Sequence, residues 1–186
     1  MPDADDFTNW CRRLKASDRE AYAEVFEALY NPIFRYVRSI TKGAASARDV
    51  TQDAFVRLWD VREGLDPSQS LEAYLYRTAR NLAYNHRRNR DTQNEKEEDI
   101  REGSNVRPAA PTSPDVAVEG AWLEKRLRTW IDDLPDRQRE ALTLSRFEGL
   151  SHDEIADVMD ISPRTVNNHI VRALKRLRTH VEDYKP

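Results

Sequence analysis

The chain has 186 residues, with 30 Lys or Arg against 33 Asp or Glu, 39% hydrophobic residues and one cysteine. That length gives one medium domain or two small ones, and the composition is too apolar for a fully disordered protein. One cysteine excludes an intrachain disulfide framework, and no run approaches the roughly 18 consecutive apolar residues of a membrane helix. The acidic N-terminus lacks the apolar core of a secretory signal, so we expect a cytoplasmic protein without membrane insertion.

Charge is unevenly distributed along this nearly neutral chain. Residues 1–90 carry 15 basic and 13 acidic side chains, residues 91–118 carry 3 and 7, and residues 119–186 carry 12 and 13. Residues 71–90 hold five Arg against one Glu, and residues 164–180 hold five Arg or Lys and no acid. Such stretches are typical of polyanion binding, although a solvated helix face with acids on neighbouring helices explains them equally well.

Apolar residues recur at helical spacing and strand alternation is not evident, so we predict an all-α fold. In the first part of the chain, this pattern predicts helices over about 21–40, 45–62 and 70–88. Pro32 falls inside the first of them, where its missing N–H and its ring predict a kink or a short break near Asn31.

Residues 91–118 are rich in charge and proline and almost without large apolar side chains. Because such a segment cannot offset its ordering entropy by burial, we predict a flexible linker there. Two small helical domains follow from this division, over residues 1–90 and 119–186. In the second domain, helices are expected at about 123–131 and 135–149, the latter with a proline at its start and a glycine at its end.

Residues 151–180 carry the pattern of a helix-turn-helix. Ser151 and Glu154 have the spacing of a capping box before a short apolar helix, and Ser162 and Pro163 start a second helix after a tight turn. A turn this short lets the two helices cross steeply, as in DNA-binding modules. A helical hairpin with a polar outer face is the plainer alternative.

The outer face of the second helix has the chemistry of a reader of the DNA major groove. Arg pairs bidentately with guanine and Asn with adenine, while cations further along the helix meet phosphates. The residues on this face are Arg164, Asn167, Asn168, Val171, Arg172 and Lys175, followed by Arg176 and Arg178.

A second basic face is predicted on the helix at 70–88, opposite its apolar residues. Cations there can follow a nucleic-acid backbone while an aromatic ring stacks on a base. The six residues at this spacing are Arg77, Arg80, Asn81, Tyr84, Arg87 and Arg88. An arginine-rich solvated face is the alternative.

The helix at 45–62 has a mixed acidic and aromatic face, which suits a protein partner better than DNA. Asp49, Gln52 and Asp53 lie on that face. Phe55 and Trp59 are expected to flank it, although a place in the core is an equally good interpretation for Trp59.

Together and in this order, these motifs resemble a bacterial RNA polymerase sigma factor of the extracytoplasmic-function type. The match covers about 20–90 and 120–180. Residues 49–59 (DVTQDAFVRLW) resemble the polymerase-clamp-binding helix of that family, and residues 74–81 (YLYRTARN) resemble its −10 element helix. Residues 134–166 resemble its −35 domain.

The resemblance implies an alternative sigma factor that binds core RNA polymerase and directs promoter-specific initiation. The first domain would dock on the coiled-coil clamp of the largest polymerase subunit through Asp49, Gln52, Asp53 and Trp59. The loop at about 62–70, with Asn81, would capture a base flipped from the −10 strand and so help to open that region. The linker would thread near the polymerase active cleft.

In the second domain, the resemblance assigns the reading of the −35 element to the last predicted helix. The reading positions implied by the resemblance are Asn167, Asn168, His169 and Arg172. The contacts expected beside them at the −35 element are Arg164, Thr165 and Lys175. Asparagines at two reading positions fit adenines in that element. Members of this family are often held by an anti-sigma factor, which adds a candidate partner to core polymerase and promoter DNA.

Other classes of protein fit less well. A stand-alone regulator with a LuxR-like output domain would bind palindromic sites as a dimer, but the first domain lacks the alternating strands and helices of a receiver. An enzyme is disfavoured because the four histidines are scattered without metal-ligand company and no phosphate- or dinucleotide-binding motif is present. We therefore expect no catalytic residue, metal or cofactor. A pure adaptor would leave the helix-turn-helix without a purpose.

Overall fold

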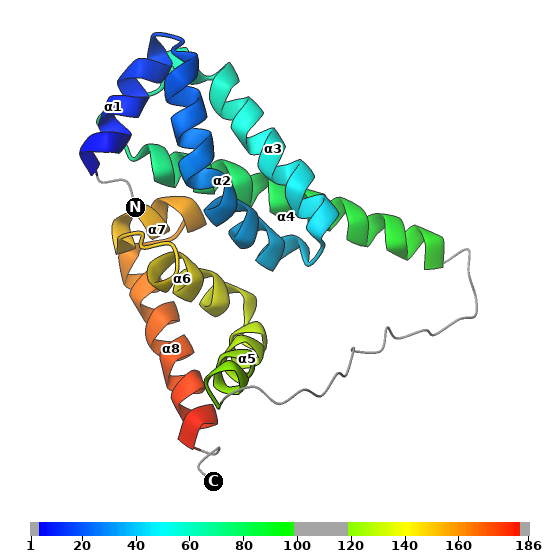
Figure 1. Ribbon diagram of the computed structural model, residues 1–186. Coiled ribbons are helices and arrows are strands. Elements are labelled where there is room, and N and C mark those ends of the chain that lie inside the picture. Colours follow the sequence, from blue (N-terminus) through cyan, green and yellow to red (C-terminus); the bar gives the residue numbers. More distant parts are fainter. Residues whose placement is uncertain (1–3, 99–118, 183–186) are drawn as a thin grey trace.

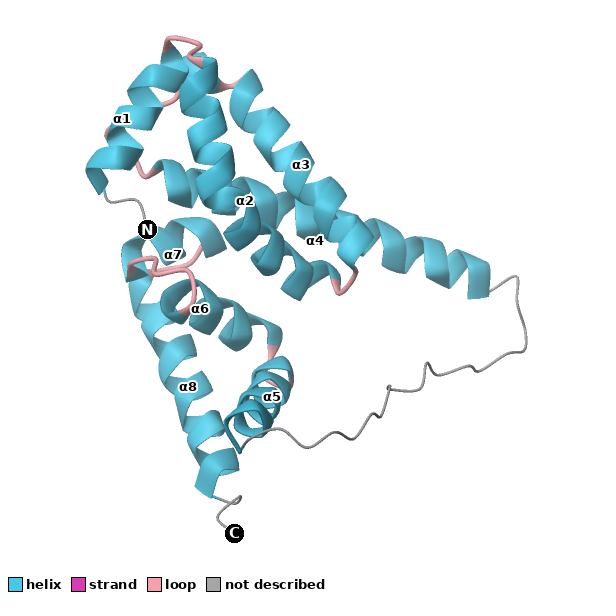
Figure 2. Ribbon diagram, in the orientation of Figure 1, coloured by secondary structure: helices cyan, strands magenta, loops and turns pink. Residues whose placement is uncertain are grey.

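The computed structural model describes residues 4–98 and 119–182, and the helices in these ranges form two lobes (Figure 1). The elements are α1 (Ala4–Lys15), α2 (Arg19–Thr41), α3 (Ala44–Asp60), the 3₁₀ turn η1 (Arg62–Gly64), α4 (Leu71–Glu98), α5 (Glu119–Asp132), α6 (Asp136–Arg146), α7 (His152–Met159) and α8 (Pro163–Glu182). Figure 2 shows helices and loops in the described residues and no strand. The predicted all-α fold is confirmed.

In the first lobe, α2, α3 and α4 pack against one another around an apolar core. α2 buries the stripe predicted for it, from Ala21 to Ile40 at helical spacing. The short break expected near Asn31 is absent. The helix continues through Pro32, and Leu29 and Ile33 on either side of it are both buried.

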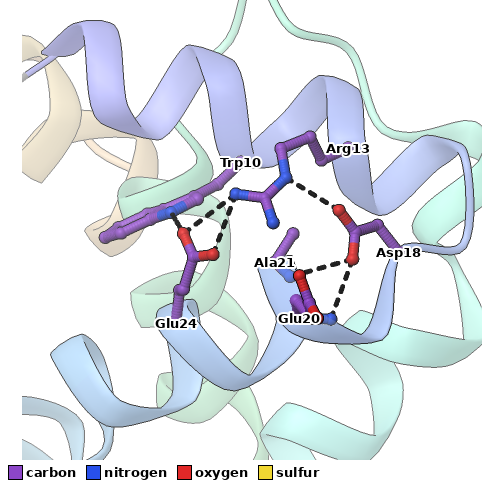
Figure 3. Close-up of polar contacts among 6 residues, drawn as sticks. All are labelled: Trp10, Arg13, Asp18, Glu20, Ala21 and Glu24. Carbon is purple, nitrogen blue, oxygen red and sulfur yellow. Dashed lines mark hydrogen bonds and ion pairs between the residues drawn. The ribbon is translucent and has the colours of Figure 1, made fainter.

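A polar cluster fixes α1 to the beginning of α2 (Figure 3). Arg13 donates from Nε to Asp18 at 2.8 Å and from Nη1 to Glu24 at 2.9 Å, and Trp10 donates from its indole N–H to Glu24 at 2.6 Å. Asp18 also caps α2 by accepting from two backbone N–H groups of the first turn. These bonds hold α1 beside η1, where Cys11 lines one side of the loop between α3 and α4.

α4 is longer than the predicted helix at 70–88, since it continues to Glu98. Glutamate, glutamine and lysine make up most of its last turns, and these are good helix formers. The first eight residues of the expected linker are therefore helical. Residues 99–118, the rest of that segment, lie outside the described part of the chain.

The predicted helix-turn-helix is present as α7 and α8. Ser151 accepts from the Glu154 backbone N–H at 3.3 Å while the Glu154 carboxylate accepts from the Ser151 backbone N–H at 2.9 Å, so the capping box is complete. Asp160 adopts the left-handed region with φ of 54° and ends α7. Ser162 then caps α8 by accepting from the Thr165 N–H at 3.2 Å.

α6 ends at Arg146, three residues before the predicted end at Gly149, and the chain then turns at that glycine with φ of 78°. α8 packs against α6 and α7, burying Val166, Ile170 and Ala173. In addition, α7 packs against α4 of the first lobe, so the two lobes are in direct contact (Figure 1).

Candidate nucleic-acid and polymerase interfaces

The outer face of α8 is open to solvent. Five of the seven residues expected to contact the −35 element are exposed, namely Arg164, Asn167, Asn168, Arg172 and Lys175. Val171, from the same predicted face, is exposed as well. The buried side of α8 fixes the helix on the lobe, so these polar groups are presented as one continuous surface.

Thr165 and His169 are half-buried and belong to the edge of this surface. The hydroxyl groups of Thr165 and Ser162 lie 2.8 Å apart at the start of α8. The Nδ1 atom of His169 is buried and has no hydrogen-bond partner among the described residues. Burial lowers the pKa of His169, as do Arg137 and Arg172 nearby, which makes it a neutral neighbour rather than a further cation.

The predicted basic face of α4 is divided in two by the second lobe. Three of its residues, Arg77, Asn81 and Arg88, are exposed. The other three, Arg80, Tyr84 and Arg87, contact carboxylates of α6. All six residues lie on α4, as predicted. The second lobe, however, covers half of the face that they form.

Glu140 of α6 is the centre of the contact and is only 5% exposed. Its Oε1 atom accepts from the Arg80 Nε at 2.7 Å and from the Tyr36 hydroxyl at 2.8 Å. Its Oε2 atom accepts from the Tyr84 hydroxyl at 3.2 Å. Arg80, itself 8% exposed, also lies over the Tyr84 ring at 4.7 Å. Both carboxylate oxygens of Glu140 are therefore hydrogen-bonded, and its charge is paired with that of Arg80.

Further links join the lobes around this centre. Arg87 and Asp136 form an ion pair at 3.0 Å at the rim. On the other side, Glu148 accepts from the Tyr76 hydroxyl at 3.0 Å. The Ser70 hydroxyl, which accepts from an N–H of the first turn of α4, donates to the Glu154 carboxylate at 2.7 Å.

The surroundings shift several pKa values in this contact. Burial, together with the Glu140 charge, raises the pKa of Tyr36, and burial likewise raises the pKa of Tyr84 and of Glu148. Glu72 of α4 lies at the same contact, where burial and the charges of Glu154 and Glu148 raise its pKa to about 7. The tyrosines are thus donors at neutral pH, and Glu72 has a pKa near neutrality.

The loop between α3 and α4 borders a cavity of about 310 Å³. Asp66 organises this loop, because its carboxylate accepts from the Ser68 backbone N–H at 2.9 Å and from the Ser68 hydroxyl at 2.8 Å. These bonds lower the pKa of Asp66. Tyr74 and Arg77 of α4 line the cavity together with Cys11. Asn81, which the resemblance associated with this loop, does not line it.

On α3, the polar residues expected to meet the polymerase are exposed, namely Asp49, Gln52 and Asp53. Phe55 is not available for such a contact, since it is 1% exposed and packs in the core against Phe26 at 4.8 Å between ring centroids. Phe55 directly follows the buried Ala54, at the edge of the apolar stripe of α3. The sequence pattern alone did not decide whether its ring faces the core or the solvent. Trp59 is half-buried, with Arg62 over its ring at 4.4 Å.

A ladder of aromatic rings lies on α2, beside α3, and was not predicted from the sequence. Neighbouring rings lie 6.4, 4.9 and 6.3 Å apart along it, and Phe26 is 37% exposed. The aromatic ladder consists of Tyr22, Phe26, Tyr30 and Phe34. The strict spacing of four residues is the signal that could have identified it.

Other kinds of site find little support in the described residues. No group of three or more His, Cys, Asp or Glu among residues 4–98 and 119–182 could hold a metal ion. None of the helices described is both long enough and apolar enough to span a bilayer.

Comparisons with known proteins place these surfaces in a family. Residues 25–93 match the family model described as "Sigma-70 region 2", and residues 124–177 match that of "Sigma-70, region 4". The RNA polymerase sigma-H factor of Pseudomonas aeruginosa is 30% identical over 167 residues, covering 87% of this chain and 86% of that protein. The ECF RNA polymerase sigma factor SigW of Bacillus subtilis is 25% identical, covering 92% and 95%.

The fold is also found in a solved structure. The sigma factor RpoE of Bartonella quintana, crystallised with the anti-sigma factor NepR, aligns with a TM-score of 0.67 at 20% sequence identity. The alignment covers 88% of this chain and 98% of that one.

Proposed function

The chain belongs to the extracytoplasmic-function family of RNA polymerase sigma factors, and from this membership we propose how its surfaces divide the work of initiation. As an alternative sigma factor it binds core RNA polymerase and promoter DNA and directs promoter-specific transcription. Members of this family are initiation factors rather than catalysts. The domain over residues 1–90 would engage polymerase and the −10 element, the one over 119–186 the −35 element, with 91–118 joining them.

The polymerase-binding surface proposed here combines the polar face of α3 with the aromatic ladder of α2. Asp49, Gln52 and Asp53 are exposed on α3, and Phe26 and Trp59 lie beside them with partly exposed rings. Acidic groups disfavour DNA, whereas aromatic rings next to polar groups are typical of the centre of a protein interface. This surface would bind the clamp of the largest polymerase subunit.

The −10 element would bind α4 and the loop before it. Arg77, Asn81 and Arg88 supply exposed donors for a DNA strand, and Tyr74 and Arg77 line the 310 Å³ cavity beside the loop. An aromatic ring and a guanidinium can both stack on a flipped base, and this stacking offsets the few kcal/mol, roughly, that unstacking the base from the duplex costs. Arg80, Tyr84 and Arg87 would complete this surface.

The exposed polar face of α8 is the observation that carries the proposal. Asn167 and Asn168 point outward with an Arg on each side along the helix, and this set suits base edges in a major groove. Lys175 lies further along the same face, where it would meet phosphates. We therefore assign the −35 element to α8, with Thr165 and His169 at its edge.

Family membership also supports two less specific expectations. Relatives of this fold are found with anti-sigma factors, as the Bartonella quintana RpoE structure shows for that protein, so an anti-sigma factor is a proposed partner here. A partner of core polymerase and promoter DNA works in the cytoplasm, which is the proposed location.

Transcription of genomic fragments by purified bacterial core polymerase, with and without the chain, tests the proposal. Mapped 5′ ends should show start sites that need the chain and share a pair of upstream elements. Asp53→Lys on α3 should abolish these transcripts while leaving the binding of −35 duplex DNA unchanged, because the two surfaces lie on different lobes.

The matched control is Glu20→Lys, the same charge reversal at an exposed residue of α2 on the side away from the aromatic ladder. If Asp53→Lys transcribes as well as this control, the α3 assignment is wrong. Binding to symmetric DNA sites without polymerase, and no new start sites, would contradict the whole proposal.

A further inference from the structure

The contact between the lobes uses the side chains that the −10 strand needs. Arg80, Tyr84 and Arg87 belong to the proposed DNA surface of α4, and all three are bonded to carboxylates of α6. A carboxylate beside a guanidinium occupies the place that a phosphate would take, with the same charge-assisted hydrogen bonds. Glu140 takes the Nε donor of Arg80, and Arg80 is only 8% exposed, so a DNA phosphate cannot reach it while the lobes are together.

The other two proposed surfaces are not affected by this contact. The outer face of α8, with Asn168, is exposed while the lobes are together, and so is the polar face of α3, with Asp53. The closed arrangement therefore covers part of one surface, at Arg80, Tyr84 and Arg87, and leaves the other two open. A non-specific collapse of the two lobes would give no reason for this selectivity.

The chemistry of the contact also suits a junction that opens. Its central groups are hydroxyls, a guanidinium and carboxylates, with Tyr36, Tyr84 and Arg80 all bonded to Glu140. Water can replace each of these bonds when the lobes part, so their net contribution to closure is small. Interfaces of this polar kind are typical of domains that move relative to each other.

We propose that the second lobe is an intramolecular competitor of the −10 strand, with Glu140 and Asp136 of α6 holding the DNA surface of α4 closed in the free chain. This rests on the proposed function of α4. Core polymerase and the −35 element can bind the closed chain, and the lobes must part before the −10 strand binds. The free chain thus discriminates against single-stranded DNA.

Glu140→Gln tests the closure from the second lobe. The full chain, without polymerase, is titrated into a fluorescein-labelled single DNA strand of random sequence, and anisotropy gives the affinity. Apparent affinity scales with the open fraction, so a chain that is open about one time in ten should bind about tenfold more tightly when released. Small-angle scattering should show an increased radius of gyration. Asp133→Asn is the control, because it removes the same charge from an exposed position of the same lobe.

Tyr36→Phe tests the same contact from the first lobe without a change of charge. Within the described part of the chain its hydroxyl bonds Glu140 alone, so its loss should also tighten strand binding and expand the chain. Ser39→Ala is the matched control, since it removes a hydroxyl whose bond to the Tyr36 carbonyl stays within α2. Helical circular dichroism and a single melting transition establish that each variant is folded.

Arg88→Ala separates the failure of this inference from that of the proposed function. Weaker strand binding by Arg88→Ala, with no gain in Glu140→Gln or Tyr36→Phe, overturns the closure and leaves the role of α4 intact. Unchanged binding by Arg88→Ala overturns both. Tighter binding and a larger radius in both release variants, beside unchanged controls, support the closure.

Discussion

α4 and α8 are both basic helices with amide side chains on the basic face, yet the two faces differ in their exposure to solvent. On α8 the face is open, because the lobe packs only against its apolar side. On α4 the same kind of face is shared between solvent and the carboxylates of α6. Charge and spacing define what a helix can bind. Acids placed elsewhere in the chain decide when it can bind.

The largest expected effect concerns the covered half of α4. Arg80→Ala leaves Glu140 buried without its cation, and removing one partner of a buried ion pair costs about 3–5 kcal/mol. The closed form should therefore give way to an extended one, seen as a larger radius of gyration by small-angle scattering. Arg88→Ala removes an exposed cation from the same helix and should leave the radius unchanged. An Arg80→Ala chain as compact as the wild type would show that the carboxylates of α6 do not hold the face of α4 closed.

On the open helix, effects should appear in DNA sequence preference rather than in shape. Asn168→Ala removes an exposed amide from the centre of the α8 face, and a bidentate contact to a base is worth about 1–3 kcal/mol of discrimination. Binding to a library of −35 duplexes should lose its preference at one base pair. Unchanged preference at every position would contradict a reading role for this residue.

A smaller effect is expected from the cation further along α8. Lys175→Ala should weaken binding to all −35 duplexes alike and reduce the slope of log affinity against log salt by about one. Titrations at several salt concentrations measure this slope. A change confined to particular base pairs would show instead that Lys175 reads sequence.

Much of this architecture could be predicted from the sequence, because the local signals agree with one another. The stripe on α2, the capping box at Ser151 and Glu154, and the cap at Ser162 each fix a helix by contacts within a few residues. The exposed face of α8 follows from the same periodicity. Where local propensity was underrated, as in the glutamate-rich end of α4, the helix ran longer than predicted.

The covering of half of the α4 face could not be predicted, because it depends on residues 49 to 60 positions away in the sequence. Tyr84 and Glu140 are 56 residues apart, and Arg87 and Asp136 are 49 apart. Nothing in either segment alone indicates the pairing. Phe55 illustrates a second limit, since at the edge of an apolar stripe only the packing of the ring against α2 decides that it is buried.

The smallest expected effect is a pH dependence of the closed form, carried by Glu72. Its pKa of about 7 in the closed form is raised by burial and by Glu154 and Glu148, and the last two causes disappear when the lobes part. The pKa of Glu72 is therefore lower in the open form, and the closed form binds more protons over part of the window between the ordinary value of 4.5 and about 7. Closure is therefore favoured below this window and weakens as the pH rises through it.

The neighbouring carboxyl groups do not reverse this sign. Glu148 also has a raised pKa, which acts in the same direction. Burial of Glu154 is outweighed by hydrogen bonds from Ser70 and Ser151, so its pKa is lowered and it titrates below the window. The radius of gyration of the free chain should increase from about pH 5.5, which lies inside this window, to about pH 7.5, which lies just above it. Glu72→Gln should flatten this rise, because its side chain keeps its size but cannot lose a proton. A chain that closes as the pH rises, or a Glu72→Gln variant as steep as the wild type, would show that these carboxyl groups do not set the equilibrium between the lobes.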